Sequence, residues 1–166
     1  MAAFCNPPVL VAGLGEYGSW TAKILSTKGR QVFGLDDDPE KLAEAIEEGY
    51  LSGASVDADP RFIEGISLVV LDMSVKQMEE WLDERELLTD PNCLFLSFNE
   101  LTPQQRYDLN MRLSGQREFM NVRLVRQGDT ISEAKIYTLE GHGAGNKLKV
   151  FQLMKALGAQ KTGYAD

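Results

Sequence analysis

The sequence predicts an α/β fold with a doubly wound, mostly parallel sheet and helices on both faces. Short apolar runs alternate with segments of helical periodicity along most of the chain, and the run at 68–71 is apolar at every position. Such continuous runs are typical of strands covered on both faces. Alternating strands and helices favour parallel pairing through right-handed crossovers. A chain of 166 residues has the size of one domain, which we expect to span 1–166.

The apolar runs and turn residues give the order of the elements. The expected strands are 9–12, 31–35, 50–56, 67–71, 93–98, 119–125 and 135–139. The expected helices are 19–28, 39–48, 75–82, 103 to 113 or 114, and 145–157. Periodicity places on the inner faces of the first two helices Trp20, Ile24, either Leu25 or Lys28, Leu42, Ala45 and Ile46.

Composition excludes several kinds of partner. The net charge of −8 argues against non-specific nucleic-acid binding, because a phosphate backbone would be repelled. Cys5 and Cys93 are expected to be buried thiols, and with one histidine and no Cys-x-x-Cys pair we expect no metal site. Residues 1–8 do not resemble a signal peptide, and no apolar run approaches the ~20 residues of a membrane span. We therefore expect a cytoplasmic protein without a membrane partner.

A glycine-rich motif, G-x-G-x-x-G, follows the first strand and opens the first helix. Gly13 allows a tight turn, Gly15 lets a pyrophosphate approach the backbone, and Gly18 lets the helix pack closely on the strand. The free N–H groups of the helix N-terminus attract phosphate, although the Glu16 carboxylate is unfavourable there unless it faces solvent. This Rossmann-type loop predicts a dinucleotide site made by Gly13, Leu14, Gly15, Glu16, Tyr17 and Gly18. A glycine turn without a ligand is the alternative.

An acidic segment follows the second strand. Asp36 comes 18 residues after Gly18, close to the spacing of ~20 expected for the acid that binds the adenosine ribose. With Asp37 beside it and no arginine, a 2′-phosphate would be repelled, so we predict NAD rather than NADP. Asp38 is expected to cap the next helix. A methyltransferase also uses a glycine loop and an acid after its second strand, but the third glycine favours a dinucleotide.

Four stretches resemble the amino-terminal domain of the 6-phosphogluconate and β-hydroxyacid dehydrogenase superfamily; prephenate dehydrogenases are similar over the first half. The first stretch is the glycine loop together with Asp36. The second and third are residues 68–74 and residues 94–104, and the fourth is residues 134–141 together with the helix that ends near residue 158. The resemblance implies that NAD is the cofactor and that Met73, Ser74 and Asn99 lie against it.

The chain also departs from that family. The family has a serine-glycine-glycine substrate turn after its sixth strand, where this chain reads V-R-L-V-R-Q-G at 122–128. The family's catalytic lysine lies in a second, helical domain, and this chain stops at Asp166, about where that domain would begin. We therefore assign no catalytic residue. Three candidates are expected to be non-catalytic, namely Lys147, Lys149 and His142, whereas Arg123 or Arg126 remains able to hold a small acid.

The acidic residues at 79–86 predict a solvated helix face, with Trp81 as a core anchor. Three functions then remain. The first is the cofactor half of an NAD-dependent oxidoreductase, completed by a separate substrate domain or by a homo-oligomer. The second is a stand-alone NAD(H)-binding sensor or regulatory module without turnover. The third is a degenerate domain kept for protein interaction only.

Overall fold

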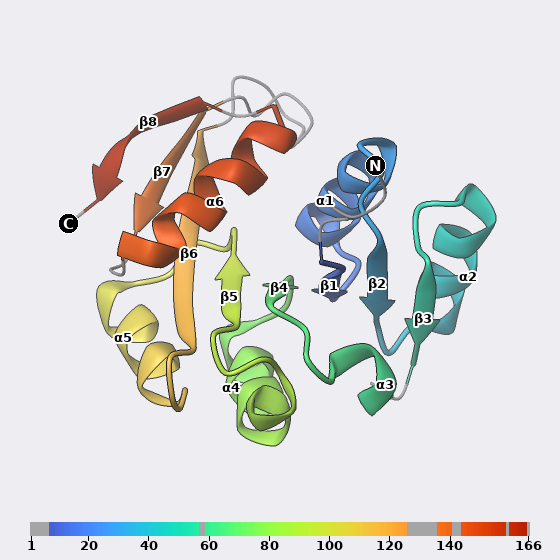
Figure 1. Cartoon of the computed structure of the whole chain (residues 1–166), viewed down its shortest axis with the longest axis horizontal. Helices are drawn as coiled ribbons and strands as arrows, with labels where there is room; N and C mark the ends of the chain where they lie inside the picture. The colour runs from blue at the N-terminus through green and yellow to red at the C-terminus, as the bar shows by residue number, and fades with distance from the viewer. Residues whose placement is uncertain (1–6, 57–58, 126–135, 141–143, 159, 166) are drawn as a thin grey trace.

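A computed structural model describes residues 7–56, 59–125, 136–140, 144–158 and 160–165, which form one sheet flanked by helices (Figure 1). The strands are β1 (Val9–Ala12), β2 (Val32–Leu35), β3 (Gly53–Ser55), β4 (Leu68–Leu71), β5 (Leu94–Ser97), β6 (Glu118–Val125), β7 (Ile136–Glu140) and β8 (Gln160–Ala165). The helices are α1 (Glu16–Thr27), α2 (Pro39–Glu48), α3 (Pro60–Ile63), α4 (Val75–Arg85), the 3-10 helix η2 (Glu86–Leu88), α5 (Pro103–Met111) and α6 (Ala144–Ala156).

The sheet has the strand order β3-β2-β1-β4-β5-β6-β7-β8. The first six strands are parallel, so the mostly parallel prediction is confirmed. Chain order reverses between β1 and β4, where Leu10 is opposite Val69. Two features differ from the expected alternation. β7 is antiparallel to β6, because the short segment 126–135 leaves no room for the crossover that a parallel neighbour needs. β8 was not predicted, since its residues form no apolar run.

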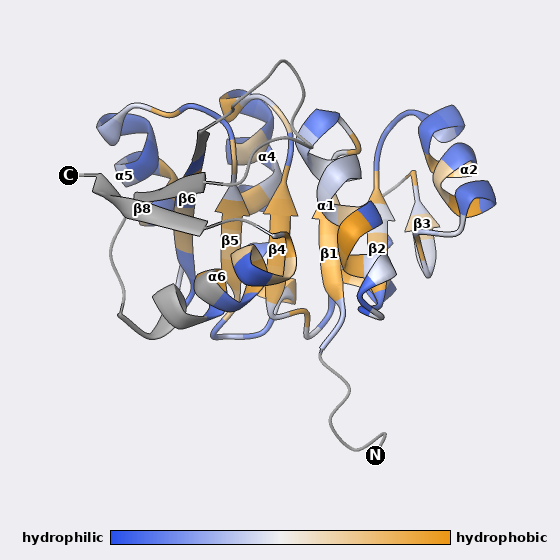
Figure 2. Cartoon of the chain, turned by 90° about the horizontal axis from the view of Figure 1, so that it is seen from above, coloured by the Kyte–Doolittle hydropathy of each residue, from blue (hydrophilic) through white to orange (hydrophobic). Residues whose placement is uncertain are grey.

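Two apolar cores, one on each face of the sheet, confirm the doubly wound arrangement. Alternate residues of β1 contribute to each core, with Val9 and Val11 on one face and Leu10 and Ala12 on the other. The first core includes side chains from α1, α2 and α6, and the second includes side chains from α3, α4 and α5. The central strands are the most hydrophobic (Figure 2). In the part of the chain that the structure describes, no helix is long and apolar enough to span a membrane.

Some of the residues that periodicity places on the inner faces of α1 and α2 are not buried. Trp20 and Leu25 are buried as expected, but Lys28 is exposed. Leu42 and Ala45 are buried, whereas Ile46 is 54% exposed, so its predicted inward position is wrong. α2 contacts β3, the edge strand of the sheet, which has only three residues.

The acidic segment on α4 and η2 is not uniformly solvated. Glu79 and Asp83 form ion pairs with Arg112, the C-cap residue of α5. Glu86 is 7% exposed, so the prediction of a solvated carboxylate is wrong for this residue. Its position becomes buried because the Ser114 hydroxyl donates to it at 2.9 Å and the Arg117 Nε lies 3.5 Å from it. Trp81 is 6% exposed and lies in the core, as predicted.

Candidate dinucleotide-binding site

The glycine loop between β1 and α1 is packed so tightly that two of its positions require glycine. Gly13 has φ +96°, and a Cβ there would lie 2.0 Å from the Asp72 carbonyl oxygen. A Cβ on Gly18 would lie 1.9 Å from the Gly13 carbonyl oxygen. The loop therefore lies directly against the end of β4, and the first turn of α1 lies directly against the loop. Gly15 is the N-cap residue of α1, so the helix begins earlier than residue 19.

A cleft of about 510 Å³ opens beside this loop, at the carboxyl ends of β1, β2 and β4. This volume lies within the range of about 300–1,000 Å³ common for small-molecule sites. Five of the residues predicted to bind the cofactor line it, namely Gly13, Gly15, Asp36, Asp37 and Met73. The others, Leu14, Glu16, Tyr17, Gly18, Ser74 and Asn99, belong to the loops and helix ends around the cleft rather than to its lining.

Asp36 joins the acidic segment to the glycine loop. Its Oδ2 accepts a hydrogen bond from the Leu14 N–H at 2.7 Å, and its Oδ1 accepts one from the Asp38 N–H at 2.9 Å. A carboxylate oxygen has two lone pairs, so each oxygen keeps one acceptor position for a ligand hydroxyl. The Asp38 side chain accepts from the Glu40 N–H at 2.9 Å, which confirms the predicted cap of α2.

Asp72, the first residue after β4, lies over the N-terminus of α1. Its Oδ2 accepts a hydrogen bond from the Gly18 N–H at 2.8 Å, and the Tyr17 N–H also donates to this carboxylate. A Cβ on Gly15 would lie 2.7 Å from the same oxygen. Burial raises the pKa of the Asp72 carboxyl above its usual value, against the lowering effect of these backbone donors and of Lys41.

Ser74 and Asn99 hold the loops that border the cleft. Ser74 caps α4, since its Oγ accepts from the Gln77 N–H at 3.2 Å. The Asn99 side chain donates to the Met73 carbonyl at 2.8 Å, and Asn121 donates to the Ser97 and Asn99 carbonyls at 2.9 and 2.8 Å. The Asn99 and Asn121 amides connect the carboxyl ends of β4 and β5 to the middle of β6, so the structure places Ser74 and Asn99 in loop-positioning roles.

Known structures share this arrangement of elements. No family model and no curated protein matches the sequence. A prephenate dehydrogenase from A. aeolicus, in complex with hydroxyphenyl propionate and NAD+, is 18% identical, with a TM-score of 0.82 over 99% of this chain and 61% of its own. A Mycobacterium tuberculosis 3-hydroxyisobutyrate dehydrogenase is 14% identical, with a TM-score of 0.77 over 96% of this chain and 55% of its own.

An imine reductase from a Pseudomonas species is 19% identical, with a TM-score of 0.76 over 97% of this chain and 56% of its own. The protein is a Rossmann-type domain. The shared fold extends over nearly all of this chain but less than two thirds of each of these three oxidoreductases. The predicted fold is therefore confirmed.

The cleft of the Rossmann-type domain also contains residues that were not predicted from the sequence. They come from β1, β2, α2, α4 and the residues that follow β3 and β4, and comprise Ala12, Leu35, Lys41, Val56, Asp72, Gln77, Glu80, Trp81, Glu84 and Arg85. Lys41 changes the expected charge of the cleft most, because only carboxylates were expected beside Asp36. Its place in the first turn of α2, directly after the acidic segment, is the signal that could have revealed it. Arg85 lies over the ring of Trp81, 5.5 Å from its centroid.

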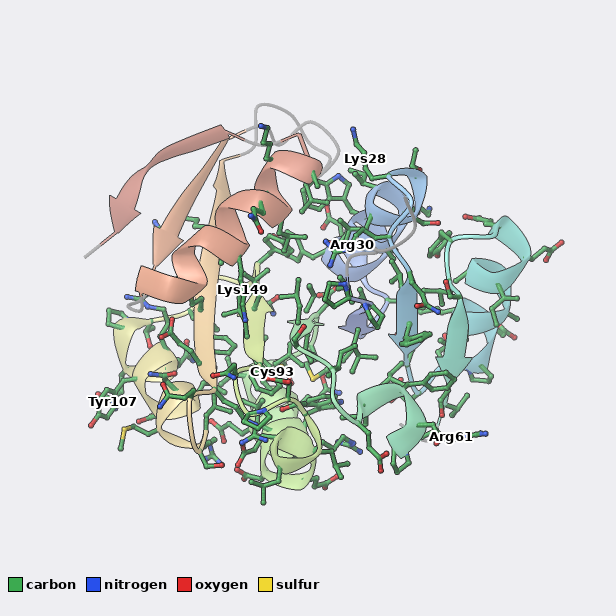
Figure 3. The ribbon with its side chains drawn as sticks, viewed as in Figure 1. Lys28, Arg30, Arg61, Cys93, Tyr107 and Lys149 are labelled. Carbon is green, nitrogen blue, oxygen red and sulfur yellow. The ribbon has the colours of Figure 1, made fainter. Side chains whose placement is uncertain are left out.

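The remaining chemical candidates lie away from the cleft or outside the described residues. The Lys149 Nζ donates to the Asn92 carbonyl at 3.2 Å, just before β5 begins, whereas the cleft lies at the carboxyl ends of the strands. Lys149 is labelled in Figure 3. Cys93 is a buried free thiol, as predicted, and burial raises its pKa to about 12. Cys5, Arg126, His142 and the Lys147 side chain lie outside the described residues. Arg123 is exposed on β6. Among the described residues, no cluster of three or more His, Cys, Asp or Glu side chains is arranged to hold a metal ion.

Proposed function

We propose that this domain binds NAD(H) and is the cofactor-binding half of an oxidoreductase. The observation that carries the proposal is the convergence of three features in one cleft: the glycine loop, the N-terminus of α1 and the Asp36 carboxylate. The cleft lies where the strand order reverses between β1 and β4, the usual ligand position in open α/β sheets.

The residues around the cleft fit the parts of a dinucleotide. The carboxylate of Asp72 already accepts hydrogen bonds from the α1 N-terminus, so this position accommodates an anion such as a pyrophosphate. The free lone pairs of Asp36 suit the two ribose hydroxyls. Val56, which is 45% exposed, gives a purine ring an apolar contact in the same cleft. The nicotinamide supplies hydride chemistry when bound, while the protein supplies binding and orientation.

A preference for NAD over NADP is part of the proposal. A 2′-phosphate on the ribose would meet the Asp36 and Asp37 carboxylates, and the former is fixed by two backbone N–H groups. Lys41 lines the same cleft and offsets part of this repulsion. We therefore expect NADH to bind about tenfold or more tightly than NADPH, because each tenfold ratio needs only ~1.4 kcal/mol.

Turnover is proposed to need more polypeptide than this domain. Hydride transfer from an alcohol needs a base within hydrogen-bond reach of the hydroxyl and a pocket that fixes the reacting carbon. The oxidoreductases with this fold have chains of which this domain matches only 55–61%. The alternative is a stand-alone, non-catalytic NAD(H)-binding module. Steady reduction of NAD+ in the presence of hydroxyacids, proportional to the concentration of this chain alone, would contradict the need for a second part.

A fluorescence titration with NADH and NADPH tests the binding proposal, and Gly15→Val provides the variant. A valine would fill the space beside the α1 N-terminus, and its Cβ would displace only the tip of the Asp72 side chain, so we expect a folded protein without NADH binding. Ala43→Val, on the exposed face of α2, is the matched control and should bind like the wild type. Equal affinity for NADPH would contradict the role of Asp36, and undiminished binding by folded Gly15→Val would contradict the site.

A further inference from the structure

We propose that the Asp72 carboxylate is an internal competitor for the phosphate position at the N-terminus of α1, so that dinucleotide binding requires this carboxylate to move away or to take up a proton. This inference rests on the proposed function and describes how that site is regulated. It makes Asp72 an autoinhibitory residue, which sets the affinity and the pH dependence of NAD(H) binding.

The first observation is the identity of the groups that Asp72 occupies. The first N–H groups of a helix have no partner within the helix, and Gly15, as N-cap, has no side chain to accept from them. Asp72 fills this role from β4, since the Gly18 N–H donates to its Oδ2 at 2.8 Å and the Tyr17 N–H donates as well. These donors are the ones that a phosphate bound at the helix N-terminus would use.

The second observation is the space that Asp72 occupies. Gly15 is the position at which the missing Cβ lets a pyrophosphate approach the backbone. In this structure the Asp72 Oδ2 takes that space, 2.7 Å from where a Cβ would be. A carboxylate and a phosphate cannot both occupy this position, and two anions in contact in a partly buried cleft repel strongly. Dinucleotide binding and the observed Asp72 position are therefore mutually exclusive while the carboxylate is charged.

The charges around Asp72 decide how readily it takes up a proton. Burial has the largest effect and raises the pKa of the Asp72 carboxyl, the backbone donors and Lys41 on α2 lower it, and Glu16 on α1 raises it slightly. The cleft wall adds three further carboxylates, Asp36 and Asp37 after β2 and Glu80 on α4, together with the Glu84 and Arg85 pair. With burial as the largest effect, the Asp72 pKa is raised. Protonation removes the repulsion and gives the carboxyl a donor that can face a phosphate oxygen.

The test is calorimetric titration of the whole chain with NAD+ from about pH 5.5 to about pH 8, for the wild type and for Asp72→Asn. The amide keeps one acceptor for the α1 N–H groups but has no charge. We expect wild-type affinity to rise as the pH falls, by at most about tenfold per pH unit for one linked proton. We expect Asp72→Asn to bind about tenfold or more tightly than the wild type at the highest pH and to be nearly independent of pH.

Glu47→Gln is the control, because it makes the same charge change in the last turn of α2, away from the cleft. It should bind NAD+ like the wild type. Equal, pH-independent binding by the wild type and Asp72→Asn would overturn the inference and leave the proposed function standing. Weaker binding by folded Asp72→Asn would also overturn it, by showing that Asp72 helps to hold the ligand. Absence of binding by both proteins at every pH would overturn the proposed function itself.

Folding of the variant is checked by circular dichroism. If Asp72→Asn does not fold, the pH dependence of the wild type decides the matter, with Asp72→Ala as a second variant. Tighter binding by Asp72→Ala supports competition, and binding that is unchanged or weaker overturns it.

Discussion

Two carboxylates are held in this domain at opposite ends of the parallel strands, and they are held differently. Glu86 lies where β5 and β6 begin and is surrounded by side chains, with the Ser114 hydroxyl at 2.9 Å and the Arg117 Nε at 3.5 Å. Arg117 is itself fixed by Thr89, to which it donates at 3.0 Å (Oγ1) and 2.8 Å (carbonyl). Asp72 lies where β4 ends, receives backbone donors from α1, and borders the cleft.

The difference separates a structural carboxylate from one beside a ligand site. The charge of Glu86 is balanced by an arginine within the fold, and replacing either partner leaves the other uncompensated. The N–H groups that hold Asp72 belong to the N-terminus of a helix, and another anion can accept from them in its place. Asp72 lies in a cleft, in an environment that raises its pKa. Such a carboxylate marks a functional position more often than one that is fully paired inside the fold, as Glu86 is.

The largest effect on stability is expected at Glu86. Arg117→Ala removes the partner of a buried carboxylate and should lower the free energy of unfolding by about 3–5 kcal/mol, measured by urea denaturation. Arg61→Ala is the control, because its pair with Asp59 is exposed on the arginine side, and it should lower the free energy of unfolding far less than Arg117→Ala. Equal losses in the two variants would show that Glu86 does not depend on Arg117.

The next effect is expected in the glycine loop. Gly18→Ala introduces a Cβ 1.9 Å from a backbone oxygen, so the loop must shift; we expect a loss of about 1–3 kcal/mol in stability and weaker NADH binding. Gly29→Ala is the comparison, since Gly29 also requires glycine, through φ +83°, but has open space around it. That variant should lose about 1–2 kcal/mol and bind NADH normally. Normal binding by Gly18→Ala would indicate that the loop does not form the phosphate position.

A smaller effect, with a definite sign, is expected for Asp72→Asn without ligand. The pKa of Asp72 is raised in the folded protein, so its ionised form lowers stability at neutral pH, and this penalty disappears as the pH falls through the folded pKa toward the unfolded value. The variant should therefore have a higher Tm than the wild type at neutral pH, with a gap that closes in acid. Thermal unfolding at several pH values measures it, and a lower Tm at neutral pH would show that capping of α1 outweighs burial.

The smallest effect is expected at the exposed ion pairs between α4 and the end of α5. Asp83→Asn removes one of the two carboxylates that contact Arg112, and its side chain is 53% exposed. We expect a small loss in the free energy of unfolding, which disappears in about 1 M salt because exposed pairs are screened. A loss that persists at high salt would show that this pair behaves as a buried ion pair, like that of Glu86, and not as an exposed one.

The sequence was sufficient for the parallel strands, the glycine loop and the position of Asp36, because these follow from local patterns. It was not sufficient for Asp72 or Glu86. Asp72 meets Gly18 across 54 residues of sequence, and only the pairing of β1 with β4 brings them together. Glu86 follows a run of carboxylates, most of which are solvated. It is buried, unlike them, because Arg117 and Ser114 pack over it. The inward position predicted for Ile46 was wrong, because helical periodicity does not show that α2 contacts an edge strand of only three residues.

The central place of β1 has a consequence for how the chain folds during synthesis. β1 is made first and is buried along its whole length, yet one of its two neighbours, β4, is made about sixty residues later. At ~5–20 residues per second, a ribosome needs several seconds to supply that neighbour. During this interval the nascent β1 keeps an open, apolar edge, which is the kind of surface that chaperones recognise and that aggregates form on. The domain therefore completes its fold only after β4 has emerged.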